Sequence, residues 1–198
     1  VKKYLEINSD LKKFEIKKFS QKDLINDVAK ALTDSKVIGW FQGRMEWGPR
    51  ALGNRSILAD ARNPNIKDII NLKIKRRESF RPFAPSVLSE FSQDWFEVKK
   101  DVPFMSEVYP VKNDKKDMLP AITHVDGTGR LQTVRKQDNE KYYELIFKFY
   151  ELTEVPVILN TSFNENEPIV RSPQEAIDCF LRTNMDILVL EDWIVKRN

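Results

Sequence analysis

Apolar residues that recur every three or four positions predict helices in four parts of the chain. Leu24, Val28 and Leu32 share one face of a helix over 21–33, and Ser20 is placed to cap its start. The same period predicts further helices over 64–77, 138–152 and 173–181. Two of these begin with a capping residue followed by proline, which is a common helix start.

Short apolar runs between these helices predict the strands of a sheet. They lie at 36–43, 56–59 and 84–89, at the end of 120–134, at the start of 155–170, and at 187–190. Strands and helices are mixed throughout, so the predicted fold is α/β, with a twisted mixed sheet flanked by helices. Residues 21–198 are expected to form a single domain. The lysine-rich residues 1–20 are expected to be a linker or edge strand that meets this domain from outside.

Glycine and arginine are concentrated between residues 39 and 55. Four of the six glycines lie there, interleaved with Arg44, Arg50 and Arg55. Glycine permits positive φ and close approach of the backbone to a ligand, and arginine forks fit phosphate and carboxylate oxygens. This composition predicts an anion site. A plain surface turn is the alternative, because Gly-Pro and Gly-Asn are ordinary turn pairs.

A second cluster of positive charge follows directly. Its cations are Lys73, Lys75, Arg76, Arg77 and Arg81. Phe80 and Phe83 are interleaved with these cations, next to two prolines. A merely solvated surface would not place its densest positive charge against aromatic residues, so this segment strengthens the prediction of an anion site.

Polar side chains also gather in two later stretches. Residues 120–134 bring His124, Asp126 and Arg130 into one loop with two glycines. The buried strand that begins at 155 ends in short polar residues, among them Asn160, Ser162 and Asn164. Open α/β sheets commonly bind ligands at strand ends. The alternatives are a capped turn for the second stretch and a structural hydrogen-bonding role for His124.

The composition excludes several classes of protein. The chain has 198 residues, 41% of them hydrophobic, which suffices for the core of one domain. Its net charge of +3 argues against nucleic-acid binding. One cysteine and one histidine give neither a disulfide framework nor a metal centre. Neither the P-loop nor the dinucleotide glycine motif is present.

No apolar run could span a bilayer and no signal peptide opens the chain, so a cytoplasmic location is expected. The first residue is Val1 rather than methionine, which indicates a fragment of a longer protein.

Four segments in order resemble the C-terminal domain of the NodU/CmcH carbamoyltransferases. They read GRMEWGPRALGNRSILAD, KIKRRESFRPFAPSVL, THVDGTGRLQTV, and NTSFNENEPIV followed by SPQEAIDCF. The resemblance runs from about Val37 to Val195. That domain is YrdC-like, and Lys75-x-Arg77 with the segment Asn160–Asn164 resembles the KxR and STSAN signatures of the wider YrdC family.

The resemblance implies a two-stage reaction. The YrdC-like domain would take carbamoyl phosphate and ATP with Mg²⁺ and form carbamoyladenylate. A kinase-like N-terminal domain with its own metal, absent from these residues, would then transfer the carbamoyl group to an acceptor hydroxyl. The catalytic residues implied by motif position are Arg50, Lys75, Arg81 and Arg130. The implied substrate- and nucleotide-binding residues are Asn160, Ser162, His124, Arg77, Arg55 and Asn164. Two-domain relatives further suggest a homodimer.

Two other functions stay open from the sequence. YrdC-like domains can recognise double-stranded RNA or make threonylcarbamoyladenylate. The near-neutral charge is unfavourable for duplex binding, and the four segments fit O-carbamoylation better. The other is a non-catalytic regulatory domain that holds a structural anion. The acceptor of the carbamoyl group is not encoded in these residues.

Overall fold

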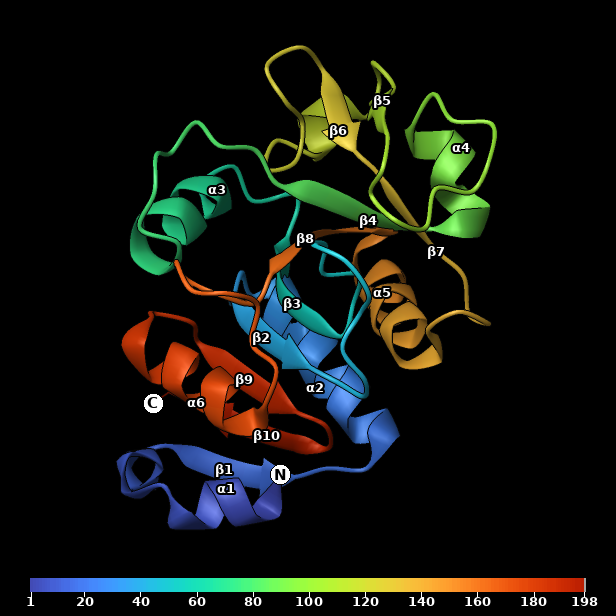
Figure 1. Cartoon of the computed structure of the whole chain (residues 1–198). Coiled ribbons are helices and arrows are strands. Elements are labelled where there is room, and N and C mark those ends of the chain that lie inside the picture. Colours follow the sequence, from blue (N-terminus) through green and yellow to red (C-terminus); the bar gives the residue numbers. More distant parts are fainter. Residues whose placement is uncertain (198) are drawn as a thin grey trace.

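An eight-stranded mixed sheet runs through the computed structural model, which describes residues 1–197 (Figure 1). Its strands, in spatial order, are β1 (Glu15–Lys18), β10 (Trp193–Lys196), β9 (Ile187–Leu190), β2 (Ile38–Phe41), β3 (Arg55–Asp60), β8 (Val157–Ser162), β4 (Ala84–Leu88) and β7 (Gln132–Val134). The pairs β2–β9 and β4–β7 are parallel, and the other neighbours are antiparallel. Strands β5 (Val108–Pro110) and β6 (Thr128–Arg130) form a separate antiparallel pair.

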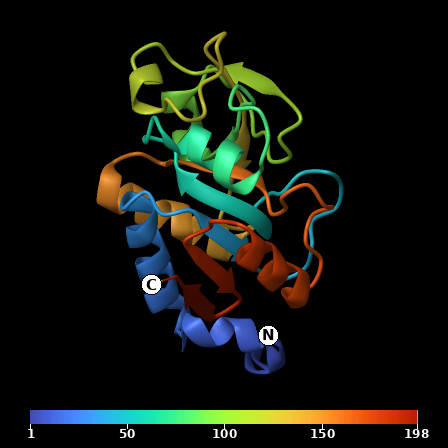
Figure 2. The same cartoon turned by 90° about the vertical axis from the view of Figure 1, so that its left-hand side faces the viewer.

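Helices cover both faces of the large sheet. Helices α2 (Gln21–Thr33) and α5 (Glu140–Thr153) pack against each other on one face, and α6 (Pro173–Arg182) packs against β2 and β9 on the other (Figure 2). The shorter elements are α1 (Lys2–Ile7), η1 (Ser9–Lys13), α3 (Ile66–Ile69), η2 (Ile70–Ile74), η3 (Ser89–Phe91), α4 (Ser92–Trp95) and η4 (Lys116–Met118). None of the helices within residues 1–197 has the length and apolar character needed to cross a membrane.

Three of the four predicted helices are confirmed. Helix α2 has the predicted bounds, and the Ser20 hydroxyl accepts a hydrogen bond from the Asp23 N–H. Helix α5 begins at Glu140 rather than 138, because the side chain of Asn139 caps it. Helix α6 carries its proline in the first turn, as predicted, and extends one residue further than expected, to Arg182. The apolar residues that recur every three or four positions in these helices form their buried faces.

The helix predicted over 64–77 is wrong at both ends. The Asn63 side chain accepts a hydrogen bond from the Asn65 N–H, and this local turn delays the helix until Ile66. After Ile69 the chain widens into the π-helical turn η2. The turn stops before Arg76, whose φ of +45° is left-handed and cannot continue a helix. Arg77 therefore lies in a loop.

The strand predictions are confirmed in the centre of the sheet and incomplete at its borders. The predicted strand at the end of 120–134 is two short strands, β6 and β7, which pair with different partners. Strand β10 was not predicted. It pairs with β1, so part of the 1–20 segment forms the outer edge of the sheet after a short helix. The overall fold, a mixed α/β domain, is as predicted.

Candidate anion-binding pocket

A cavity of about 330 Å³ opens where two loops, the β6 hairpin and the end of β8 meet. The first loop, residues 42–54, connects β2 to β3 and is here named the glycine loop. The second, residues 75–83, connects η2 to β4 and is named the arginine loop. The lining residues are Pro49, Arg50, Ala51, Arg77, Arg81, Pro82, Phe83, Ala84, Met105, His124, Arg130, Asn160, Thr161 and Ser162.

The pocket brings together most of the side chains that sequence reasoning selected. The ones that line it are Arg50, Arg77, Arg81, His124, Arg130, Asn160 and Ser162. They come from positions up to 112 apart in the sequence, counting from Arg50 to Ser162. The candidates Lys75, Arg55 and Asn164 are not among the lining residues. The grouping of four arginines is therefore a product of the fold and not of local sequence.

The lining holds four arginines and, within the described residues, no aspartate or glutamate. The guanidinium groups of Arg50 and Arg130 form no hydrogen bond or ion pair with any residue in the described range 1–197. Burial and then the positive charge of Arg130 lower the pKa of Arg50. Two guanidinium groups that repel each other without a counter-charge favour binding of an anion between them.

The two arginines of the arginine loop are partly engaged. The Nε of Arg77 donates to the side-chain oxygen of Asn71 at 2.7 Å, and its guanidinium lies 5.1 Å from the Phe83 ring centroid. Burial and then Arg81 lower the pKa of Arg77. Arg81 is paired with the exposed Glu78 at 2.9 Å. Arg81 is thus the pocket arginine with an acidic partner at hand.

Asn160 forms the floor of the pocket and is fully buried. Its Nδ2 donates to the Ala51 carbonyl at 3.1 Å, the Ser86 hydroxyl at 3.1 Å and the Gln132 side-chain oxygen at 3.0 Å. The bond to Ala51 ties the glycine loop to β8, directly beside Arg50. The Oδ1 of Asn160 is buried with no hydrogen bond of normal geometry, and the fully buried Tyr142 hydroxyl, whose pKa the Asn160 side chain lowers, is its polar neighbour.

His124 is held neutral in the pocket wall. Burial is the largest effect and lowers the pKa of its imidazole, whereas Asp126 and a hydrogen bond to the Phe83 backbone act in the opposite direction. Its Nδ1 lies 3.3 Å from the Thr128 hydroxyl, and its backbone N–H donates to the Thr128 carbonyl at 2.8 Å. A neutral imidazole can offer one N–H to a ligand and is not a fixed positive charge.

Lys75 points away from the pocket into a cage of oxygens. It is 2% exposed, and its ammonium donates to the Ser162 carbonyl at 2.5 Å, the Asn164 carbonyl at 2.8 Å and the Asn164 side-chain oxygen at 2.6 Å. Burial, and then Arg77, lower the pKa of Lys75 to about 7. Lys75 thereby fixes the end of β8, where Ser162 lines the pocket.

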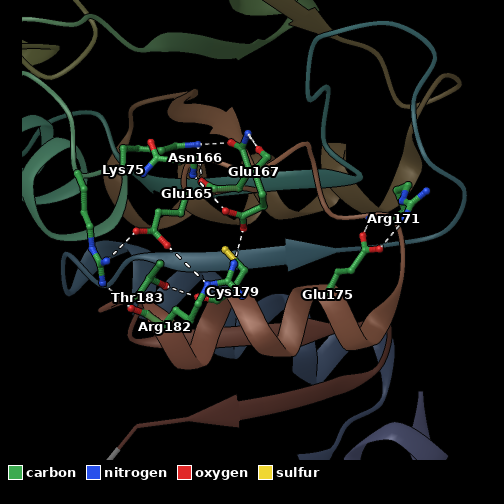
Figure 3. Close-up of polar contacts among 11 residues, drawn as sticks. Lys75, Glu165, Asn166, Glu167, Arg171, Glu175, Cys179, Arg182 and Thr183 are labelled. Carbon is green, nitrogen blue, oxygen red and sulfur yellow. Dashed lines mark hydrogen bonds and ion pairs between the residues drawn. The ribbon is translucent and has the colours of Figure 1, made fainter.

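The cage adjoins a cluster of ion pairs that includes Glu165, Glu167 and Arg182 (Figure 3). Arg182 reaches from α6 to Glu167 at 2.7 Å and to Glu165 at 3.6 Å. Arg76 pairs with Glu165 from the other side at 3.0 Å. The Asn164 Nδ2 donates to the Glu167 carbonyl at 2.7 Å, so this candidate is part of the support behind the pocket.

Arg55 is occupied by the backbone of the glycine loop. Its guanidinium donates to the carbonyls of Gln42 at 2.6 Å and Gly43 at 3.0 Å, and it stacks 3.5 Å from the centroid of the Phe41 ring. These contacts hold the start of the glycine loop against β2, and Arg55 does not line the pocket.

Sequence reasoning missed two residues that organise the loops. One oxygen of Glu46 accepts hydrogen bonds from the backbone N–H groups of Leu52, Asn54 and Arg55, at 2.8, 2.6 and 3.3 Å. Asn71 contacts the arginine loop. Each carried a signal in the sequence: Glu46 is the one acidic residue between positions 39 and 59, and Asn71 interrupts the apolar face of the predicted helix.

Comparison with known proteins identifies related sequences over most of the chain. The family model described as "Carbamoyltransferase C-terminus" matches residues 29–197. Nodulation protein NolNO of Sinorhizobium fredii is 51% identical over 179 residues, which cover 88% of this chain and 26% of NolNO. An uncharacterized Synechocystis protein, sll1178, is 47% identical over 200 residues, covering 90% of this chain and 32% of that protein. This chain thus spans a third or less of each of these two relatives.

Solved structures of low sequence identity share the fold. Full-length HypF in its phosphate- and nucleotide-bound form matches with a TM-score of 0.60 at 19% identity, over 85% of this chain and 25% of HypF. Sua5 of P. abyssi in complex with L-threonine matches with a TM-score of 0.56 at 16% identity, over 88% of this chain and 48% of Sua5. These likenesses confirm the predicted YrdC-like fold. The family match and the NolNO identity establish that the chain belongs to the carbamoyltransferase C-terminus family.

Proposed function

We propose that this domain binds ATP and carbamoyl phosphate in the arginine-lined pocket and forms carbamoyladenylate. An N-terminal kinase-like domain of the same polypeptide would then use this intermediate to carbamoylate an acceptor hydroxyl. The family match and the relatives support carbamoyl transfer in general. The share of those relatives that the chain spans leaves room for the second domain.

The observation that carries the proposal is the charge of the pocket. Four arginines converge on one cavity whose described lining has no carboxylate, and two of them lack any partner in the described chain. A pocket that must hold two anionic substrates side by side needs fixed positive charge to offset the repulsion between their phosphates. Guanidinium forks supply that charge and orient phosphate oxygens through paired N–H groups.

The atom balance of the reaction defines what the pocket has to do. Carbamoyladenylate has a bond from a carbamoyl oxygen to the α-phosphorus of ATP, and that bond replaces the one to pyrophosphate. The phosphate of carbamoyl phosphate also has to leave, through cleavage by water that gives carbamate and phosphate. The pocket must therefore bind carbamate in closed surroundings until its oxygen attacks, because carbamate decomposes in water.

The side chains divide this work by their chemistry. Arg50 and Arg130, which are free, would bind phosphate oxygens of the two substrates. The amide of Asn160 and the imidazole of His124, which both line the pocket, would form uncharged hydrogen bonds with the carbamoyl group. No group of three or more His, Cys, Asp or Glu within residues 1–197 is arranged to hold a metal. Mg²⁺ would enter the pocket bound to the phosphates of ATP.

The proposal is tested by pyrophosphate release from ATP and Mg²⁺ in the presence of carbamoyl phosphate. We expect release to require carbamoyl phosphate, to fail with bicarbonate and threonine in its place, and to be lost in Arg50→Ala. Arg171→Ala is the matched control, because Arg171 is exposed and paired with Glu175 outside the pocket. ATP binding without release would show that the pocket needs the second domain. Absence of ATP binding would refute the proposal.

A further inference from the structure

A single buried amide, Asn71, joins the helical turn η2 to the arginine loop. Asn71 is fully buried, and its neighbours in the turn, Ile70 and Ile74, are fully buried as well. A polar side chain in apolar surroundings is stable there only when its donors and acceptors are satisfied. Both polar atoms of its side chain have partners in the structure, and these partners lie in the arginine loop.

The contacts of Asn71 reach both arginines that this loop contributes to the pocket. Its backbone carbonyl accepts from the Arg77 N–H at 2.9 Å, and its Oδ1 accepts from the Arg77 Nε at 2.7 Å. Its Nδ2 donates to the carbonyls of Ser79 at 3.1 Å and Arg81 at 3.0 Å. Asn71 thus orients one guanidinium directly and fixes the backbone that carries the other.

Residues 77–81 of the arginine loop have little other support. They follow the left-handed Arg76, which breaks the helical path, and one internal bond joins the Arg81 N–H to the Glu78 carbonyl at 3.3 Å. Among residues 1–197, no other side chain from outside the loop hydrogen-bonds to the backbone of 77–81. The π-helical turn contributes to the geometry, because its wider path, closed by the Lys75 N–H to the Ile70 carbonyl at 2.8 Å, precedes the loop.

We propose that Asn71 is a positioning residue of the anion pocket, which sets the directions of Arg77 and Arg81 before a ligand binds. The inference rests on the proposed function in one respect, that phosphate groups occupy this pocket. An amide of this length is the one side chain that accepts from Arg77 and donates to two carbonyls at once. Serine is too short, aspartate lacks the donors, and leucine leaves all three partners unsatisfied.

Pyrophosphate is the probe, because it carries the phosphate chemistry without depending on turnover. Its dissociation constant would be measured by calorimetry on the 198-residue chain and on Asn71→Ser. We expect the variant to bind about 10- to 100-fold more weakly, the range for losing well-oriented charged hydrogen bonds. Thr183→Val is the matched control: Thr183 is a buried polar residue whose hydroxyl bonds to the Cys179 carbonyl, away from the pocket, and its loss should leave binding unchanged.

A double-mutant cycle separates positioning from general support of the fold. If Asn71 acts through Arg77, Asn71→Ser should weaken binding much less in an Arg77→Ala background than in the wild type. Equal binding by wild type and Asn71→Ser, or additive losses in the cycle, would overturn the inference and leave the proposed function standing. Failure of the wild type to bind pyrophosphate would overturn both.

An NMR measurement on the wild type does not depend on the variant folding. The Nε–H signal of Arg77 would be assigned by its loss in Arg77→Lys. This proton should be protected from solvent exchange in the ligand-free domain, because the Asn71 Oδ1 already accepts a hydrogen bond from it. Rapid exchange without ligand, with protection only after pyrophosphate is added, would contradict the proposed positioning.

Discussion

The pocket and the ion-pair cluster behind Ser162 contain the same kinds of cation in opposite situations. In the pocket, Arg50 and Arg130 have no partner among the described residues. In the cluster, Arg182 is held by two carboxylates, and Lys75 by three close oxygens (Figure 3). The number of oxygens already bound to a cation therefore separates a group that is available to a ligand from one that supports the fold.

The largest effect is expected when a free cation is removed. Arg130→Ala should weaken pyrophosphate binding by about 100- to 1000-fold, as for loss of a preorganised charged contact. The midpoint temperature of thermal unfolding should stay unchanged or rise slightly, because the repulsion between Arg130 and Arg50 disappears. Arg182→Ala is the counterpart in the cluster and should show the reverse, with unchanged binding and lower stability. Equal losses of binding in the two variants would erase the distinction between the two regions.

A second, smaller effect tests the caged lysine. Lys75→Met should lower the free energy of unfolding by about 2–3 kcal/mol, because it removes the ammonium that donates to the carbonyls of Ser162 and Asn164 and to the Asn164 side-chain oxygen. Urea denaturation measures this loss, and Lys73→Met is the control, with the same substitution at an exposed position. We expect binding to weaken less than in Arg130→Ala. A folded and stable Lys75→Met that no longer binds pyrophosphate would instead make Lys75 a direct ligand contact.

Much of the fold and of the pocket could be predicted from local pattern. Periodicity located α2, α5 and α6, and the four motif segments contained most of the polar side chains that line the pocket. The direction of each side chain could not be predicted. Lys75 and Arg77 are two positions apart in one motif, yet the left-handed Arg76 between them turns one into the protein and the other toward the cavity. Arg55 faces inward because three-dimensional pairing of β2 with β3 sets it over Phe41.

The roles of the two overlooked residues could not be predicted for the same reason. Asn71 and Glu46 bind backbone groups of loops whose paths are set by tertiary contacts. A single sequence shows that a polar residue interrupts an apolar stripe, or that an acid stands among arginines. It does not show which N–H or carbonyl groups come within reach, since those lie in loops without periodic pattern.

The smallest expected effect has the opposite sign and concerns Arg81, the pocket arginine with a nearby acid. Glu78→Gln removes its exposed partner at 2.9 Å while keeping the size of the side chain. Because exposed ion pairs are weak, we expect pyrophosphate to bind only about two- to fivefold more tightly. Calorimetry at low and high salt measures the change, which should shrink as salt screens both the pair and the ligand. Glu175→Gln, which frees Arg171 outside the pocket, is the control and should leave binding unaffected. Weaker binding in Glu78→Gln would mean that Glu78 orients Arg81 for the ligand rather than competing with it, and would place Arg81 with the supported cations.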